Sequence, residues 1–213
     1  MFKINSKRSI TLAAAAVLLL AWSSPALAKG PMATLKHTHS AIDKLLAKQV
    51  VTGSASEKTV NKQITDKVNA FVNYKELARR SLAKHWDARS AQEQDEFVDL
   101  LRDLIERNYV KQLRKAHGKQ PEYRGEKLDG DKAQVETAIT VTNKRGRTST
   151  LVIAYKMQKV GAVWMVYDVV TDDQSIVRNY KAQFNKIIKK NSYEYLVKKM
   201  RKKAAKGEAT KNS

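Results

Sequence analysis

The sequence predicts an α+β fold, with helices before and after an antiparallel meander sheet of four or possibly more strands. Apolar residues recur with the helical period of about 3.6 residues before Pro121 and again after Ser175. Between these points they alternate with the period of two that is typical of strands. From Thr150 to Val170 both strand faces are apolar, so both sides of the sheet must be covered. We expect helices to cover one side, and helices or a bound guest molecule to cover the other.

The first 28 residues have the pattern of a secretory signal peptide. Positive residues precede an apolar run at 10–21 and a small-x-small cleavage pattern, Ala-Leu-Ala, at 26–28; the positive residues are Lys3, Lys7 and Arg8. The alternative, a membrane anchor, is disfavoured because the run is shorter than the ~20 residues that a spanning helix needs. We expect an exported protein that is cleaved near Ala28.

The remaining chain suits one domain at residues 29–205, followed by a basic flexible tail at 206–213. The sequence has no cysteine, which excludes disulfides and thiolate metal sites. Its net charge is +20, which favours anionic partners. Nucleic acid is not expected, because the chain has neither a zinc-finger spacing nor the aromatic RNP signature. An anionic membrane surface or an acidic protein is the expected class of partner.

Four helices are predicted before the sheet and two after it. The apolar repeats define their extents, and capping boxes mark the starts of the second and fourth helices, at Ser54 with Glu57 and at Ser90 with Glu93. The predicted ranges are 35–50, 54–71, 74–86 and 90–113 before the sheet, and 176–188 and 193–200 after it.

Four strands are predicted between these helices, at 122–128, 132–142, 147–158 and 162–171. Asp129-Gly130 is a signal for a two-residue turn, whereas 144–146 and 159–161 fit three-residue loops with glycine at the left-handed position. These turns predict four cross-strand pairs: Ile139 with Leu151, Val135 with Tyr155, Tyr155 with Met165, and Ile153 with Tyr167.

The predicted pairs sort the strands into an apolar face and a mixed face. The mixed face combines Glu136 and Thr140 with Trp164, Val166 and Val170. The apolar face is continuous over three strands and consists of Val135, Ile139, Val141, Leu151, Ile153, Tyr155, Met157, Val163, Met165, Tyr167 and Val169.

Motifs for catalysis or metal binding are scarce. His37 and His39 are two residues apart and point to different sides of a helix, so they cannot chelate a metal together. The chain has no nucleophile elbow, P-loop or dinucleotide fingerprint. Asp168 is the one candidate for a general acid or base, because it falls between apolar residues. The alternative is a carboxylate near the sheet edge that pairs with a lysine or arginine.

Several segments together resemble one known family. They are YKELARRSLAKHW at 74–86, SAQEQDEF at 90–97, WMVYDVV at 164–170, SIVRNY at 175–180, and the helix at 193–200. In this order they resemble the MlaC family of periplasmic phospholipid-binding proteins, also called toluene-tolerance auxiliary proteins. The chain departs from the family pattern at Ala83, Asp173 and Asn191, where glycine is expected.

The resemblance implies a soluble periplasmic carrier that maintains outer-membrane lipid asymmetry. Such a carrier exchanges phospholipid between an inner-membrane ABC transporter complex, with its substrate-binding subunit, and an outer-membrane lipoprotein complex. The implied fold is a helix-covered curved sheet related to the NTF2-like architecture, with acyl chains between sheet and helices. Phospholipid is then cargo, and neither an enzyme activity nor a cofactor or metal is expected. We expect the cavity to be lined by Leu101, Leu104, Ile139, Leu151, Ile153, Tyr155, Met165, Tyr167 and Val169, with Arg124 near the headgroup.

Two other classes of function remain open. One is a small enzyme built on the same sheet, with Asp168 as general base, and it requires that Asp168 open into a cavity. The other is a basic adaptor that binds acidic protein or membrane surfaces without an internal guest. Its binding would collapse with salt, because exposed charges are screened beyond ~8 Å at physiological ionic strength.

Overall fold

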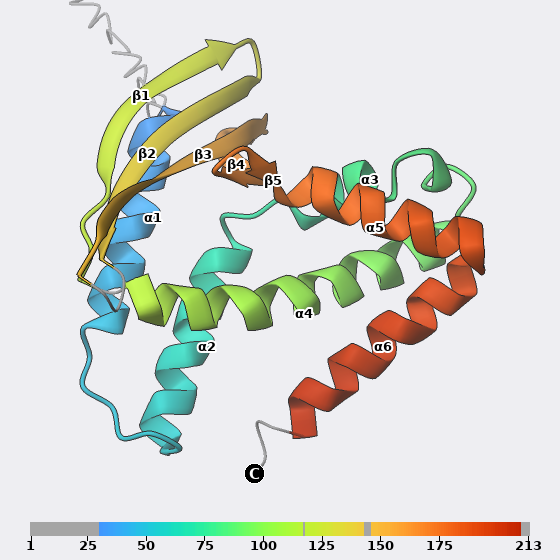
Figure 1. Cartoon of the computed structure of the whole chain (residues 1–213), viewed down its shortest axis with the longest axis horizontal. Coiled ribbons are helices and arrows are strands. Elements are labelled where there is room, and N and C mark those ends of the chain that lie inside the picture. The colour runs from blue at the N-terminus through green and yellow to red at the C-terminus, as the bar shows by residue number, and fades with distance from the viewer. Residues whose placement is uncertain (1–29, 117, 143–145, 210–213) are drawn as a thin grey trace, which may run out of the picture.

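The computed structural model describes residues 30–116, 118–142 and 146–209, and the side chains of all of these except 107–116 and 206–209. Within them the chain forms an α+β fold, as predicted (Figure 1). The predicted signal peptide lies outside the described residues, and α6 continues into the predicted tail. The helices are α1 (Pro31–Leu46), α2 (Ala55–Asn69), α3 (Tyr74–Leu82), the 3₁₀ helix η1 (Ala83–His85), α4 (Ala91–Ala116), α5 (Ile176–Lys190) and α6 (Tyr193–Ala209). The strands are β1 (Glu122–Asp129), β2 (Lys132–Thr142), β3 (Thr148–Val160), β4 (Val163–Thr171) and β5 (Gln174–Ser175).

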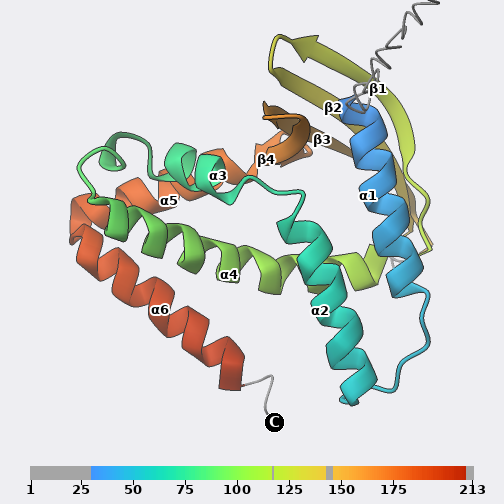
Figure 2. The same ribbon diagram turned by 180° about the vertical axis from the view of Figure 1, so that it is seen from behind.

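The strands form one antiparallel meander in the order β1-β2-β3-β4-β5. Helix α1 lies against the sheet, and Figure 2 shows it in front of β1 and β2. Helices α3 to α6 lie to the other side of the molecule (Figure 1). None of the helices in the described ranges is long and apolar enough to cross a membrane.

The predicted register of β2 with β3 is confirmed, because Ile139 lies opposite Leu151 and Val135 lies opposite Tyr155. The loop between these strands falls partly on residues 143–145, which lie outside the described residues. Alternation, together with a loop expected at 144–146, therefore gave this register correctly.

The predicted register of β3 with β4 is wrong. Tyr155 lies opposite Val169 rather than Met165. One cause is the turn, which has two residues instead of three, since Val160 pairs with Val163. Gly161 occupies the turn with φ +59°, a left-handed conformation that glycine adopts without strain.

A β-bulge in β4 is the second cause. Met157 pairs with Val166, but the ladder then resumes at Asp168, so Tyr167 is an extra residue. Ile153 consequently lies opposite Thr171 rather than Tyr167. The bulge also exchanges the two faces of β4 halfway along the strand.

Three apolar clusters hold the elements together. The helical core joins α3, α4, α5 and α6, the sheet core joins α1 to the sheet, and a smaller cluster joins α1 to α2. The helical core is centred on Phe97, which is fully buried and meets Phe184 edge-on at 5.5 Å. It also includes Leu77, Leu82, Trp86, Leu101, Val177, Tyr193, Leu196, Val197 and Met200.

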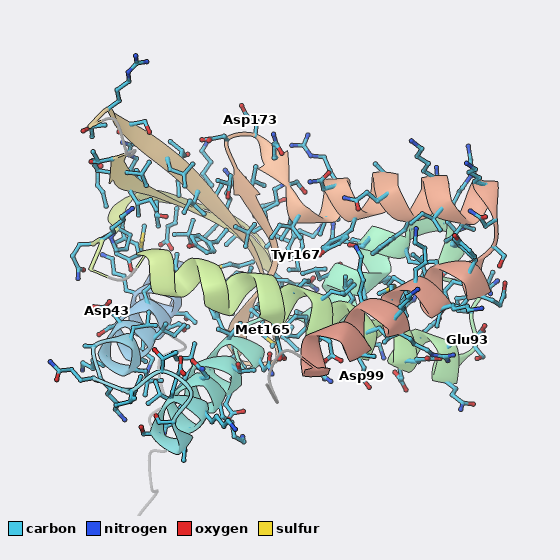
Figure 3. All side chains as sticks on the ribbon, turned by 60° about the horizontal axis from the view of Figure 1, so that its bottom comes forward. Asp43, Glu93, Asp99, Met165, Tyr167 and Asp173 are labelled. Atoms are coloured by element: carbon cyan, nitrogen blue, oxygen red, sulfur yellow. The ribbon has the colours of Figure 1, made fainter. Side chains whose placement is uncertain are left out.

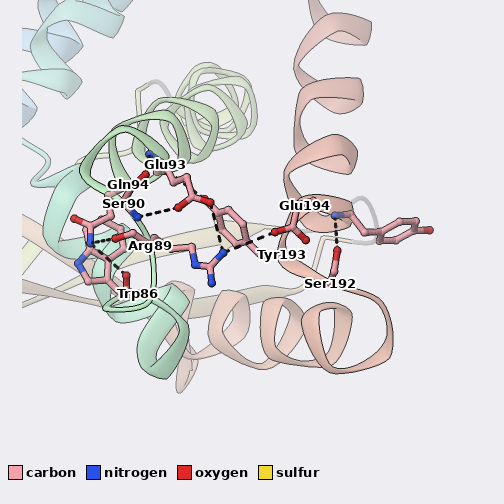
Figure 4. Close-up of polar contacts among 9 residues, drawn as sticks. Trp86, Arg89, Ser90, Glu93, Gln94, Ser192, Tyr193 and Glu194 are labelled. Atoms are coloured by element: carbon pink, nitrogen blue, oxygen red, sulfur yellow. Dashed lines mark hydrogen bonds and ion pairs between the residues drawn. The ribbon is translucent and has the colours of Figure 1, made fainter.

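Polar contacts fasten the start of α6 to the start of α4 (Figure 4). The hydroxyl of Tyr193 donates to the carbonyl of Glu93 at 3.1 Å. The guanidinium of Arg89 lies 4.6 Å from the centre of the Tyr193 ring and 3.8 Å from the Glu194 carboxylate. The predicted capping box is present, since the Ser90 hydroxyl accepts from the Glu93 amide and the Glu93 carboxylate accepts from the Ser90 amide.

Candidate functional site

One face of the sheet, called the inner face, is apolar over three strands. It consists of every second residue of β2 and β3 around the Val135–Tyr155 pair, and of their partners on β4. Its members are Ala133, Val135, Thr137, Ile139 and Val141 of β2, Leu151, Ile153, Tyr155 and Met157 of β3, and Trp164, Val166 and Val169 of β4.

Protein closes the half of the inner face that is nearest the β1–β2 and β3–β4 turns. Leu35 of α1 is fully buried in the sheet core, and Met32 and Phe71 pack beside it. Val135 and Met157 on the strands are also fully buried. This half is an ordinary protein core.

The other half of the inner face, towards the end of β2 and the start of β3, is less covered. Ile139 and Leu151 are only partly buried, and no apolar cluster of the described side chains includes them. Ile153 and Val169 lie at the margin of the sheet core and are also partly buried. Helix α4 extends towards this end of the sheet (Figure 1). The apolar face therefore reaches beyond the described side chains that cover it.

Polar groups at the inner face and beneath α1 are few and paired. The Thr137 side chain is fully buried and donates to the carbonyl of Ile153 at 3.4 Å. His39 of α1 shares a 2.9 Å hydrogen bond with the Tyr123 hydroxyl and meets the Tyr155 ring edge-on at 5.5 Å. Burial lowers the pKa of His39 to about 4, so this imidazole is neutral near pH 7. An uncharged lining of this kind suits an apolar guest.

Acidification should destabilise the protein through His39. Its pKa falls from 6.5 to about 4 on folding, so the unfolded chain binds the proton more readily, and stability is lost as the pH falls from about 6.5 to about 4. Linkage gives a loss of about 2 kcal/mol between pH 7 and pH 5. Urea unfolding of the wild type and of His39→Gln at both pH values measures this loss. Equal losses in the two proteins would contradict the assignment to His39.

The predicted cavity residues of α4 belong to the helical core. Leu101 is fully buried there, and Leu104 packs against the same cluster while remaining partly exposed. Of the two, only Leu104 keeps surface that a guest could contact.

Two predicted cavity residues of β4 do not point as expected. Met165 pairs with Gln158 and therefore lies on the face opposite to Tyr155, which corrects its predicted placement. Tyr167 occupies the bulge (Figure 3). The Arg80 guanidinium of α3 lies 4.3 Å from the centre of the Tyr167 ring. The inner-face positions are taken instead by Trp164 and Val166, which the predicted register placed on the mixed face. The two-residue turn places them there, since Trp164 pairs with Lys159 and Val166 with Met157 before the bulge is reached.

Arg124 is also displaced from its predicted position. Glu126, not Arg124, lies opposite Val135, because Asp129 pairs with Lys132 and the two-residue turn is Gly130-Asp131 rather than the predicted Asp129-Gly130. Arg124 itself is the unpaired residue at the irregularity between Tyr123 and Gly125. The Arg124 guanidinium lies 3.4 Å from the carboxylate of Glu122. Its proposed contact with a headgroup therefore competes with an existing ion pair.

Asp168 does not open into the apolar space. It is 4 % exposed and accepts hydrogen bonds from the Ser175 hydroxyl at 2.7 Å and from the Val177 amide at 3.1 Å. Lys156 lies 3.9 Å away on the same face, opposite to Tyr155. These contacts engage both carboxylate oxygens and tie β4 to the start of α5. Across the described residues, no group of three or more His, Cys, Asp or Glu side chains could hold a metal.

The chain matches one known protein family over most of its length. The model of the MlaC protein family matches residues 37–202. The chain belongs to the MlaC family. No curated protein sequence matches it significantly.

A solved structure shares the fold of this chain. It is a phospholipid-binding protein from Ralstonia solanacearum in complex with a phospholipid. The two structures superpose with a TM-score of 0.68 over 84 % of this chain and 98 % of the other, at 19 % sequence identity. At this identity the likeness establishes the fold.

Two departures from the MlaC pattern fall where the backbone favours glycine. Ala83 has φ 49° and ψ −122°, and Asp173 has φ 63°. Alanine is strained in the first conformation, whereas aspartate tolerates the left-handed region.

Ala83→Gly should therefore raise the free energy of unfolding by about 1 kcal/mol. Asn191, at φ −130°, is the matched control, and Asn191→Gly should bring no gain in the same urea titration. A gain at Asn191 as large as at Ala83 would contradict backbone strain as the cause.

Proposed function

We propose that this MlaC-family chain is a soluble phospholipid carrier. The acyl chains of the bound lipid lie between α4 and the less covered half of the inner face, towards the end of β2 and the start of β3. The observation that carries the proposal is the apolar surface at Ile139, Leu151, Ile153 and Val169, which extends beyond the described side chains that cover it. Tyr155 and Leu104 would border the same space. The Ralstonia relative of the same fold, a phospholipid-binding protein with a bound phospholipid, supports it.

The energetics of lipid transfer explain why such a carrier needs a dry cavity. A phospholipid with two chains has ~30 methylenes, and at ~0.8 kcal/mol each their exposure to water costs roughly 24 kcal/mol. Free diffusion through water is therefore negligible. The lining must also demand no hydrogen bonds, which the paired Thr137 and the neutral His39 satisfy.

The compartment and partners follow from the same proposal. The N-terminal 28 residues direct export, and the mature chain works in the periplasm. There it exchanges phospholipid with an inner-membrane ABC transporter complex and an outer-membrane lipoprotein complex. The lipid is cargo rather than cofactor, and the carrier performs no chemistry on it.

Native mass spectrometry of protein purified from a periplasm tests the proposal. We expect a mass increment equal to one or more phospholipids, which organic extraction then identifies. Protein that is lipid-free and also takes up no lipid from liposomes would refute the carrier function. Binding that is lost with salt, together with a lipid-free protein, would favour the basic adaptor.

A further inference from the structure

We propose that the outer face of α6 is a docking surface for an anionic membrane, separate from the lipid cavity. This outer stripe consists of Tyr195, Lys198, Lys199 and Lys202, all exposed. Their spacing of three, four and seven residues places them on one side of the helix, along ~10 Å of its axis.

The opposite side of α6 is fixed in the helical core. Tyr193, Leu196, Val197 and Met200 are each less than a tenth exposed. Arg89 and Glu93 hold the first turn of the helix (Figure 4). Because the apolar side is occupied, α6 cannot roll over to insert into a bilayer. Its contact with a membrane is therefore superficial, electrostatic and reversible.

The charges of the outer stripe are not neutralised within the described structure. No described carboxylate forms an ion pair with Lys198, Lys199 or Lys202. Arg201, beside the stripe, is already paired with Glu96 of α4. The free charges therefore attract an external anionic surface.

The residue types favour a membrane over an acidic protein. Lysine is a compact, mobile charge that suits a diffuse layer of phosphates, whereas arginine suits the fixed, bidentate geometry of protein carboxylates. The only arginine in the α6 range Tyr193–Ala209 is Arg201, which Glu96 engages. Tyr195 is 44 % exposed in the stripe, with the Lys199 ammonium 5.6 Å from its ring centre. An amphipathic aromatic ring among lysines is typical of membrane interfaces.

Co-sedimentation with vesicles tests this surface. We expect the mature protein, purified from a periplasm, to bind vesicles that contain phosphatidylglycerol, not to bind vesicles of pure phosphatidylcholine, and to be released by salt. Each lysine near an anionic surface contributes roughly fivefold in partitioning, so the triple variant Lys198→Glu, Lys199→Glu, Lys202→Glu should lose about a hundredfold or more.

The matched control changes the same number of charges elsewhere. Lys44, Lys127 and Lys132 are equally exposed on α1 and on the β1–β2 hairpin, and their triple change to glutamate should retain most of the binding. The proposal is overturned if the control loses as much as the α6 variant, if the α6 variant binds normally, or if polyglutamate binds to α6 while anionic vesicles do not. Lipid content, measured separately by native mass spectrometry, should be the same in both variants, so failure of docking and failure of the carrier function remain distinguishable.

Discussion

Ile153→Asp should abolish phospholipid uptake while the protein stays folded. Ile153 lies on the inner face, on the same strand as Tyr155, and is only partly buried by described side chains. A substitution at Ile153 therefore alters the proposed lipid-binding space more than the protein core. A carboxylate facing acyl chains would be desolvated without a partner, which costs several kcal/mol. Since ~1.4 kcal/mol corresponds to a factor of ten, lipid affinity should fall at least a hundredfold. Native mass spectrometry after incubation with liposomes measures the loaded fraction.

Met165→Asp is the matched control for this experiment. Met165 is on the neighbouring strand and is similarly buried, but it pairs with Gln158 on the opposite face of the sheet. The variant should load lipid like the wild type. Normal loading of a folded Ile153→Asp protein would show that the inner face is not the pocket. Loss of loading in Met165→Asp alone would place the pocket on the other side of the sheet.

Most elements of the fold could be predicted because local chemistry specifies them. The capping box at Ser90 forms as expected. At Ser54 the hydroxyl accepts from the Glu57 amide, but the Glu57 carboxylate accepts from the Gly53 amide rather than from the Ser54 amide. Period-two alternation identified the strands, and the pairing of Val135 with Tyr155 followed. These features depend on residues close in sequence or on simple alternation, both of which are visible in one chain.

The β-bulge in β4 could not be predicted, because its cause is not local. At the bulge, the Asp168 carboxylate reaches the start of α5, and the Tyr167 ring lies under Arg80 of α3. A sequence shows neither the helix that needs a cap nor the arginine that covers the ring. A single inserted residue then reverses the face of every residue on one side of it. Met165 lies between the turn and the bulge, so its misplacement has a different cause, the two-residue turn in place of the predicted three-residue loop. Asp168 lies on the predicted face, and its contact with Lys156 agrees with the alternative of a paired carboxylate.

Asp168→Ala should lower the free energy of unfolding by about 3 kcal/mol. The carboxylate is buried and accepts from both the Ser175 hydroxyl and the Val177 amide. Its removal leaves two buried donors without a partner, each costing ~1–3 kcal/mol. It also weakens the cap of α5, because the Ser175 hydroxyl is held in place to accept from the Arg178 amide at 3.0 Å. Urea unfolding monitored by circular dichroism measures the loss.

Asp168→Asn separates this structural role from a catalytic one. The amide keeps one oxygen acceptor at nearly the same volume, so it should recover part of the stability that alanine loses. Ser175→Ala removes the cap of α5 and one of the two donors to Asp168, and should cost about 1 kcal/mol or more. A carboxylate held open for a substrate would make few contacts within the protein, so its replacement would cost little stability. A stable Asp168→Ala protein would therefore reopen the enzymatic alternative, whereas a graded loss from asparagine to alanine assigns the carboxylate to the join between β4 and α5.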